Sequence, residues 1–238
     1  MKIMNYEVFT QGLDKIDLSK KQIINTINAH SYILAKKDNL FLKALNKSDK
    51  LIPDGSGIVL AAKLLKKRKI LKIAGAELHI YLLNEMEKTG GKVFYMGASQ
   101  NTLDKIEEKI EHEYPNIKVE SYSPPFKDSF NDEENQEIIN KINDFSPNVL
   151  FIGMTAPKQE KWLYTHKDKL NFTTASCVGA VFDFYSGTIE RPSQFWLDLH
   201  LEWLPRLLKE PKRLWRRNFI STPLFLIDIF LYKLGVKK

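Results

Sequence analysis

Residues 92–113, KVFYMGASQNTLDKIEEKIEHE, contain the pattern on which the fold of this chain depends. The short apolar run from Lys92 to Met96 predicts a buried strand, and the longer segment from Asn101 to Glu113 predicts a surface helix. A Gly-Ala-Ser stretch lies between the two and is typical of a tight turn. A strand that leads directly into a helix is the unit from which parallel sheets are built.

The same unit recurs along most of the chain. Four further strands are expected at Gln22–Ile27, Ile117–Ser121, Asn148–Ile152 and Thr173–Val178. Helical patterns lie between them at Ala29–Leu45, Gly57–Lys67, Ala76–Lys88, Asp132–Phe145 and Pro157–Lys169. This alternation predicts an α/β fold, a Rossmann-like parallel sheet flanked by helices. We expect one catalytic domain over residues 1–190 and a helical, membrane-associating appendage over residues 191–238.

Polar residues and glycines follow several of the expected strands. Thr26 and Asn28 end the first strand, Gly97 follows the second, residues 153–157 follow the fourth and residues 179–183 follow the fifth. Open parallel sheets bind ligands beyond the carboxyl ends of their strands, where the free N–H groups of helix N-termini suit a phosphate. Turn formation explains any one of these loops, but four at one edge predict a nucleotide-type site.

Several common binding motifs are absent from the sequence. It has no Walker-type loop, no G-x-G-x-x-G after the first strand and no Asp-x-Asp pair. The five histidines lack metal-ligand spacing, and a single cysteine, Cys177, excludes a disulfide within the chain. We therefore expect no metal and no cofactor, so that carboxylates, amides and arginines carry the chemistry.

Nearly all the surplus positive charge lies in residues 202–238. This segment has nine Lys or Arg and three acids, whereas the rest of the chain has 27 basic and 26 acidic residues. Its basic residues alternate with tryptophans and lead into the apolar run Phe219–Leu234. Anionic headgroups attract cations, and aromatic and aliphatic side chains enter the interface below them. The segment is typical of an anchor for an anionic membrane surface.

A helix that crosses the bilayer is not expected. The run Phe219–Leu234 is interrupted by polar residues and is shorter than the roughly 20 apolar residues that a span needs. Residues 1–17 lack the apolar segment of a signal peptide. The expected location is the cytoplasm, peripheral on the inner face of the membrane.

Two short stretches contain candidate catalytic residues. In PDGSG, residues 53–57, Asp54 is either a helix N-cap or turn aspartate or a general base at the ligand edge. In GMTAPKQE, residues 153–160, Gln159 and Glu160 either form a solvated first helical turn or hydrogen-bond to sugar hydroxyls. The residues alone leave both alternatives open.

These stretches belong to an ordered series of motifs. The series consists of Thr26-Ile27-Asn28-Ala29, Pro53-Asp54-Gly55-x-Gly57, Gly75 with Glu77-Leu78, Gly97, Gly153-x-x-x-Pro157-Lys158-Gln159-Glu160-x-Trp162, Val178-Gly179-Ala180-x-Phe182-Asp183, Ser186-Gly187, Arg191, Leu201-Glu202-Trp203-x-x-Arg206-Leu207 and Glu210-Pro211-x-Arg213-Leu214-x-Arg216-Arg217. It resembles the WecG/TagA/CpsF family of bacterial glycosyltransferases, family 26 of that class, over about 195 residues.

The resemblance implies a reaction. Such enzymes move an N-acetylmannosamine-type sugar from a UDP-sugar to a polyprenyl-diphosphate-linked acceptor, an undecaprenyl-diphosphate saccharide, on the cytoplasmic face of the bacterial plasma membrane. They invert the anomeric centre and need no metal. Another UDP-hexose donor, for capsule or exopolysaccharide, is the alternative. The resemblance also implies that the protein is a homo-oligomer in solution.

The resemblance also assigns roles to individual residues. It implies Asp54 as the base, with Thr26, Gln159, Arg213 and Arg216 as further catalytic residues. The substrate-binding residues that it implies are Asn28, Lys72, Gly97, Gly153, Pro157, Glu160, Asp183 and Arg206. Arginines suit a UDP diphosphate in a site without metal, but for Lys212 and Arg217 we prefer simple attraction to lipid headgroups.

One position departs from the family pattern. Lys72 stands where members usually have arginine. The positive charge is kept, but a lysine cannot form the two parallel hydrogen bonds that an arginine guanidinium makes to a phosphate or carboxylate. The reaction class is unaffected, but we expect the donor preference to differ.

Two other functions are considered. A nucleic-acid-binding module would use the basic and aromatic tail for phosphates and bases, but it has no need of the apolar run that follows. A sugar-nucleotide hydrolase or epimerase would share the nucleotide pocket, but its reaction does not need a C-terminal segment that binds lipid.

Overall fold

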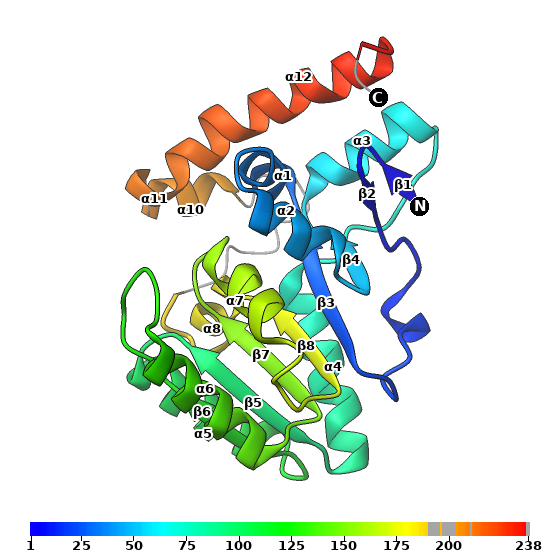
Figure 1. Cartoon of the computed structure of the whole chain (residues 1–238). Coiled ribbons are helices and arrows are strands. Elements are labelled where there is room, and N and C mark those ends of the chain that lie inside the picture. The colour runs from blue at the N-terminus through cyan, green and yellow to red at the C-terminus, as the bar shows by residue number, and fades with distance from the viewer. Residues whose placement is uncertain (190–195, 197–202, 210, 237–238) are drawn as a thin grey trace.

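The centre of the molecule is a six-stranded parallel sheet, seen in a computed structural model that describes residues 1–189, 196, 203–209 and 211–236 (Figure 1). The strands are β3 (Gln22–Ile27), β4 (Lys50–Pro53), β5 (Lys92–Gly97), β6 (Lys118–Tyr122), β7 (Val149–Gly153) and β8 (Thr174–Cys177). They lie in the order β4-β3-β8-β7-β5-β6, and every neighbouring pair is parallel. The expected α/β class is confirmed.

Helices connect the strands and cover both faces of the sheet. They are α1 (Ala29–Ala35), α2 (Asn39–Asn46), α3 (Ser56–Lys66), α4 (Gly75–Thr89), α5 (Gln100–Glu113), α6 (Asp132–Phe145), α7 (Lys158–His166) and α8 (Ala180–Tyr185). A short 3₁₀ turn, η1 (Leu13–Lys15), and an antiparallel pair of strands, β1 (Lys2–Ile3) and β2 (Tyr6–Glu7), precede the sheet.

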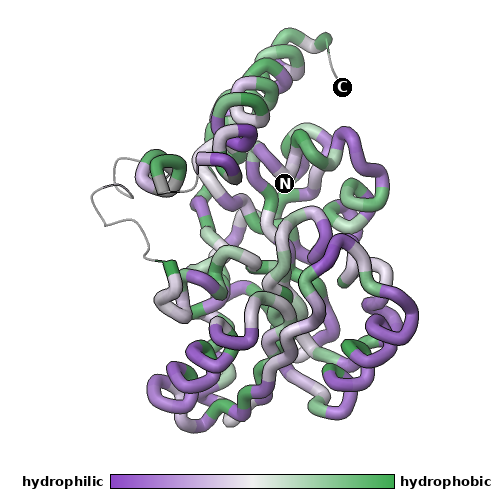
Figure 2. The backbone as a smooth tube through the Cα atoms, turned by 90° about the vertical axis from the view of Figure 1, so that its left-hand side faces the viewer, coloured by the Kyte–Doolittle hydropathy of each residue, from purple (hydrophilic) through white to green (hydrophobic). Residues whose placement is uncertain are grey.

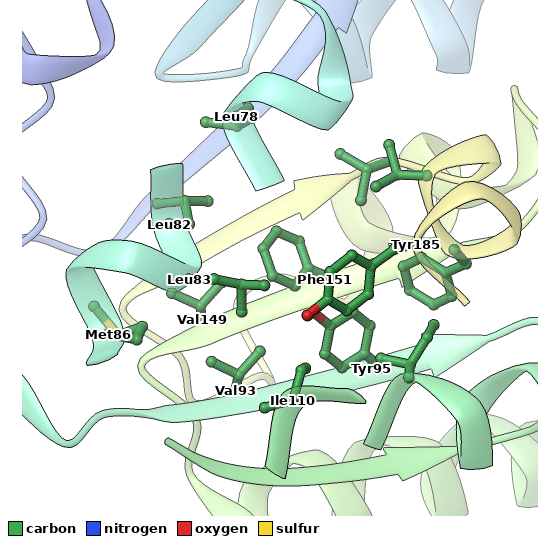
Figure 3. Packing of buried hydrophobic residues seen from close by; sticks show 14 of the residues in the cluster. Leu78, Leu82, Leu83, Met86, Val93, Tyr95, Ile110, Val149, Phe151 and Tyr185 are labelled. Carbon is green, nitrogen blue, oxygen red and sulfur yellow. The ribbon is translucent and has the colours of Figure 1, made fainter. Parts of the chain in front are cut away.

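Both faces of the sheet are buried, which explains why its central strands are apolar along their whole length. All five residues of β7 are buried. One face packs against α4, α5 and α8, and includes Tyr95 and Phe151 (Figure 3). The opposite face packs against α6 and α7 around Phe94 and Trp162. The two layers of helices fix the sheet, so the loops at its carboxyl edge start from fixed points.

The first helical segment differs from the expectation. The prediction of one helix over Ala29–Leu45 is wrong, because α1 ends at Ala35 and a second helix, α2, follows. The carboxylate of Asp38 caps α2 by accepting a hydrogen bond from the Phe41 N–H at 3.0 Å. The same carboxylate pairs with Lys161 of α7 at 2.8 Å, which holds the new helix in place.

The C-terminal segment is helical where it is described. It comprises α10 (Trp203–Lys209), α11 (Pro211–Arg216), the π-helical turn η2 (Arg217–Ser221) and α12 (Thr222–Lys233). The expected domain boundary, between residues 190 and 191, lies outside the described residues. No helix in the described part of the chain is both long enough and apolar enough to cross a bilayer.

A third apolar cluster joins α12 to the domain. It contains side chains of α1, α2, α3, β1 and β2 together with Phe225 and Ile229 of α12. Figure 1 shows α12 lying across α1 and α3, and Figure 2 shows the apolar residues along its length. The C-terminal helix is therefore packed against the domain through part of its own apolar surface.

Candidate functional site

The loops after β3 and β4 lie side by side at the carboxyl edge of the sheet. The Asp54 N–H donates to the Ile27 carbonyl at 2.9 Å, which joins the ends of the two strands. A Cβ placed on Gly55 would lie 3.9 Å from the Cβ of Asn28. The structure thus brings Asp54 and the Thr26–Asn28 segment together, although 25 residues separate Asn28 from Asp54 in the sequence.

Asp54 is half-buried and lies just before α3. The N-cap of that helix is Gly55, so the alternative in which Asp54 is the cap is wrong. Gly55 has φ 90°, a conformation that L side chains rarely adopt. A carboxylate beside a helix N-terminus is stabilised in its charged form by the helix dipole, and a charged carboxylate is what a general base requires.

Asn28 fixes the beginning of α1. Its Oδ1 accepts hydrogen bonds from the His30 and Ser31 N–H groups, both at 3.0 Å, and its own N–H donates to Ser31 Oγ at 2.8 Å. This capping box gives the side chain a structural role at the edge where the sequence places it. Thr26, two residues earlier, is half-buried.

Lys72 lies on the segment that leads into α4. The next residue, Ile73, donates its N–H to the Pro53 carbonyl at 3.0 Å, so this segment runs beside the end of β4. Lys72 is half-buried there. The structure therefore brings the backbone of Lys72 close to that of Asp54, in agreement with the sequence motifs.

Gly97 and Gly153 are adjacent at the ends of β5 and β7. A Cβ on Gly97, which has φ 112°, would lie 2.6 Å from the Gly153 carbonyl oxygen, and a Cβ on Gly153 would lie 2.4 Å from the ring of Phe182. Close packing alone accounts for glycine at both positions.

The connections from β5 and β7 leave toward opposite edges of the sheet, and such switch points are where open α/β sheets bind ligands.

Gln159 and Glu160 lie inside the protein at the start of α7. Their exposed fractions are 5% and 7%, so the alternative of a solvated first turn is wrong. Gln159 Oε1 accepts from the Met154 N–H at 3.1 Å, and its Nε2 donates to Glu160 Oε1 at 2.8 Å. Among the residues that the structure describes, Glu160 Oε2 finds no hydrogen-bond partner. Burial raises the pKa of Glu160 to about 7.

The Gln159 amide also lies against the loop that follows β8. A Cβ on Gly179 would lie 3.0 Å from Gln159 Oε1, so the β7–α7 and β8–α8 loops meet at this point. Pro157, the N-cap of α7, is preceded by a cis peptide bond. These contacts bring Gln159 and Pro157 into the same group of loops as Gly153.

Asp183 lies on α8 and is half-buried. Its carbonyl oxygen accepts hydrogen bonds from Ser186 Oγ at 3.2 Å, Thr188 Oγ1 at 3.1 Å and the Ile189 N–H at 3.0 Å. The segment that leaves α8 is therefore folded back on that helix before the chain enters the C-terminal appendage.

The predicted arginines lie on the appendage helices. Arg206 is on α10 and Arg213 is on α11, and the side chains of both lie outside the described part of the structure. Arg216 is exposed, and its guanidinium lies 5.5 Å from the ring centroid of Trp215. In Figure 1 α10 and α11 extend to the side toward which the arrowheads of β5 and β7 point.

Lys158 is a residue that the site prediction omitted. Its Nζ donates to the Lys127 carbonyl at 2.5 Å and lies 3.8 Å from the ring centroid of Phe130, and burial lowers its pKa. Ser123 Oγ donates to the Ala98 carbonyl at 2.8 Å. The β6–α6 loop is thus held against its neighbours. The place of Lys158 between Pro157 and Gln159 in the motif was the available signal.

Within the described residues, no group of three or more His, Cys, Asp or Glu side chains is arranged to hold a metal ion. The described polar residues on the loops at this edge include half-buried Asp54, Asn28 and Lys72 and the buried amide of Gln159. Side chains of these types are able to transfer protons and to bind hydroxyls and phosphates.

Comparison with known proteins identifies the class. Residues 2–238 match the family model described as "Glycosyl transferase WecG/TagA/CpsF family", so the chain is a glycosyltransferase. It belongs to the WecG/TagA/CpsF family, which confirms the resemblance seen in the motifs.

Curated relatives agree with this assignment. A protein of Bacillus subtilis is 29% identical over 227 residues, 94% of this chain and 86% of its own length. One of Bacillus spizizenii is 28% identical over 92% of this chain and 82% of its own, and one of Staphylococcus aureus strain MW2 is 29% identical over 90% and 82%. All three are named N-acetylglucosaminyldiphosphoundecaprenol N-acetyl-beta-D-mannosaminyltransferase.

Proposed function

We propose that this chain transfers N-acetylmannosamine, or a derivative of it, from a UDP-sugar to N-acetylglucosamine linked to undecaprenyl diphosphate. The product would enter a bacterial surface polymer such as a teichoic acid. The named activity of the relatives supports this substrate pair. The observation that carries the proposal is the junction of the Asp54 loop with the Asn28 loop at the carboxyl edge of the sheet.

Asp54 is the proposed general base. Its carboxylate takes the proton of the acceptor hydroxyl while that oxygen attacks the anomeric carbon. The bond from the anomeric carbon to the diphosphate breaks, and UDP leaves with the bonding electrons. A single displacement inverts the anomeric centre. A positioned base accelerates such a step by about 10²–10⁴-fold.

The leaving diphosphate needs positive charge beside it. Lys72, next to the end of β4, is the proposed group on the domain, and Arg206, Arg213 and Arg216 are the proposed groups on the appendage. A guanidinium binds phosphate through two parallel hydrogen bonds, whereas an ammonium group acts as a point charge. In this proposal these cations, without a metal ion, stabilise the departing UDP.

The apolar surface of α12 supports a location on the membrane. Phe225 and Ile229 are buried against the domain, but Leu226, Ile227 and Phe230 on the same helix are exposed. A largely apolar helix is normally buried on most sides, so the exposed apolar side of α12 favours contact with a second apolar environment such as the membrane interface. The exposed cations Lys212 and Lys233 suit anionic headgroups. We place this surface on the inner face of the plasma membrane.

The test is an acceptor-dependent release of UDP. The full chain is mixed with a panel of UDP-sugars and with anionic vesicles that carry synthetic undecaprenyl-diphosphate N-acetylglucosamine. We expect release of UDP and a lengthened lipid-linked saccharide, fastest with the N-acetylmannosamine donor, and no release without acceptor. A faster reaction with another hexose would correct the donor, and rapid release of UDP without acceptor would contradict transfer in favour of hydrolysis.

A further inference from the structure

A buried charge joins the C-terminal helix to the catalytic domain. Asp228, in the middle of α12, is 4% exposed. Its Oδ2 accepts hydrogen bonds from the Tyr32 hydroxyl at 3.1 Å and from Lys36 Nζ at 2.5 Å. Burial, followed by the nearby Asp228 carboxylate, raises the pKa of Tyr32, so its hydroxyl stays protonated and donates. Tyr32 lies on α1, and Lys36 is the C-cap of that helix.

A second polar contact reaches the first turn of α1. Ser221 Oγ, at the end of η2, lies 2.8 Å from His30 Nδ1. His30 is two residues after Asn28 and supplies one of the N–H groups that Asn28 caps. The C-terminal segment therefore contacts the first turn of α1 as well as its C-terminal end.

Phe225 makes an apolar contact that connects α12 to the beginning of α3. Its side chain is fully buried, and its ring packs edge-on against Tyr32 at a centroid distance of 5.1 Å. A Cβ on Gly57 would lie 3.2 Å from Phe225 Cε1 and 3.4 Å from the Cβ of Ala29. The ring thus packs where the first turns of α1 and α3 meet, directly behind the loops that contain Asn28 and Asp54.

We infer that Phe225 and Asp228 are positioning residues for the transfer reaction. Phe225 packs against the first turns of α1 and α3, Asp228 ties α12 to Tyr32 and to the C-cap Lys36 of α1, and the two contacts together clamp α12 onto the helices that begin at the Asn28 and Asp54 loops and hold those loops in place. The inference rests on the proposed function for the meaning of these loops. It is separate from membrane contact, because the two positioning side chains are buried, whereas the side chains assigned to the membrane are exposed. Small misplacements of reacting groups are costly, since about 1 Å can reduce a rate 10²-fold.

The first test measures kcat and KM without vesicles, with a water-soluble short-chain acceptor, so that membrane binding is irrelevant. We expect Asp228→Ala and Phe225→Ala each to lower kcat by at least about tenfold per folded molecule. The double variant Asp228→Leu with Lys36→Met should recover kcat to within about threefold, because it removes the buried carboxylate together with its partly exposed partner and leaves no lone charge at the contact. Asp144→Ala, which removes an exposed carboxylate of α6, is the matched control and should leave kcat unchanged.

The second test measures hydrogen exchange of the folded protein, which needs no substrate. In Asp228→Ala and Phe225→Ala, exchange should accelerate at the amides of residues 28–32 and 55–59 and stay unchanged at residues 92–97 of β5. Binding of both variants to anionic vesicles should stay within about threefold of wild type, since the exposed face of α12 is intact.

The outcomes separate positioning from stability. If kcat per folded molecule stays within about threefold of wild type in both single variants while their unfolding temperatures fall, the clamp only stabilises the fold and the inference is wrong. Unchanged exchange at residues 28–32 and 55–59 would also overturn it. If wild type transfers no sugar from any UDP donor, the proposed function fails, and the exchange result alone decides whether α12 holds these turns.

Discussion

Glu160 makes the stability of this protein depend on pH in a way that one substitution should remove. Burial raises the pKa of its carboxyl group from an ordinary value of 4.5 to about 7, because the charged form loses its hydration inside the protein. Gln159 donates to one carboxyl oxygen, but no group in the described part of the chain bonds to the other, so the hydrogen bond only partly offsets the burial. The folded state therefore favours the protonated acid.

The shift in the pKa of Glu160 determines both the direction and the size of the change in unfolding free energy with pH. Between pH 4.5 and 7 the folded protein holds a proton on Glu160 that the unfolded chain releases, so the free energy of unfolding falls as pH rises. Below pH 4.5 the contribution is fully present, and above pH 7 it is lost. One pKa unit corresponds to about 1.4 kcal/mol, so the loss across this window is about 3 kcal/mol.

The assay is urea unfolding of wild type and of Glu160→Gln at several pH values from 4.5 to 8. Glutamine keeps an oxygen that accepts from Gln159 but does not ionise. We expect the stability of the variant relative to wild type to rise by about 3 kcal/mol over this range, since all other titrating groups are shared. Glu108→Gln, at an exposed position on α5, should show no such rise. Parallel pH profiles for wild type and Glu160→Gln, within about 0.5 kcal/mol, would refute the assignment.

Three further predictions test other parts of the structure. Gly97→Ala should lower the free energy of unfolding by about 2 kcal/mol or more, measured in urea, because its Cβ meets the Gly153 carbonyl at a positive φ. Lys72→Met should raise KM for the UDP-sugar about tenfold, whereas Lys72→Arg should change it less than about threefold, because arginine keeps the charge. Phe230→Asp should weaken flotation with anionic vesicles about tenfold and leave the unfolding free energy unchanged, because this ring is 60% exposed.

Each of these predictions has a contradicting result. An unfolding free energy of Gly97→Ala equal to that of wild type would show that the two strand ends separate without cost. Equal donor KM values for Lys72→Met and wild type would remove Lys72 from the diphosphate site. Undiminished vesicle binding by Phe230→Asp would place the membrane contact elsewhere on the chain.

The fold was readable from the sequence wherever a strand was apolar and a long helix followed it. β3 begins and ends where the pattern predicts, β5 extends one residue further than predicted, and β7 is shifted by one residue at both ends. The strand β4 was not predicted, because only Leu51 and Ile52 lie between Lys50 and a proline. Its pairing with β3 supplies the stability that so short a run lacks by itself.

The site was readable as a set of residues but not as an arrangement. The motifs place Asp54, Asn28, Lys72 and Gln159 at one edge, and the structure brings their backbones to neighbouring loops. Local sequence does not show that Glu160 is buried, since that depends on packing between distant segments. The Asn28 cap is local, because its partners are His30 and Ser31, and the prediction missed it by assigning Asn28 to the substrate. The clamp on Asp228 had a signal, a carboxylate within an apolar run, but its partners come from about 190 residues away.

The most direct test of the account compares turnover by wild type and by Asp54→Asn. Asparagine has the same shape but takes no proton from the acceptor hydroxyl. Turnover of the UDP-sugar with the lipid-linked acceptor should fall at least about 10²-fold, while the Kd for UDP stays within about threefold of wild type. Turnover by Asp54→Asn equal to that of wild type would contradict the central claim that the Asp54 loop supplies the base for transfer.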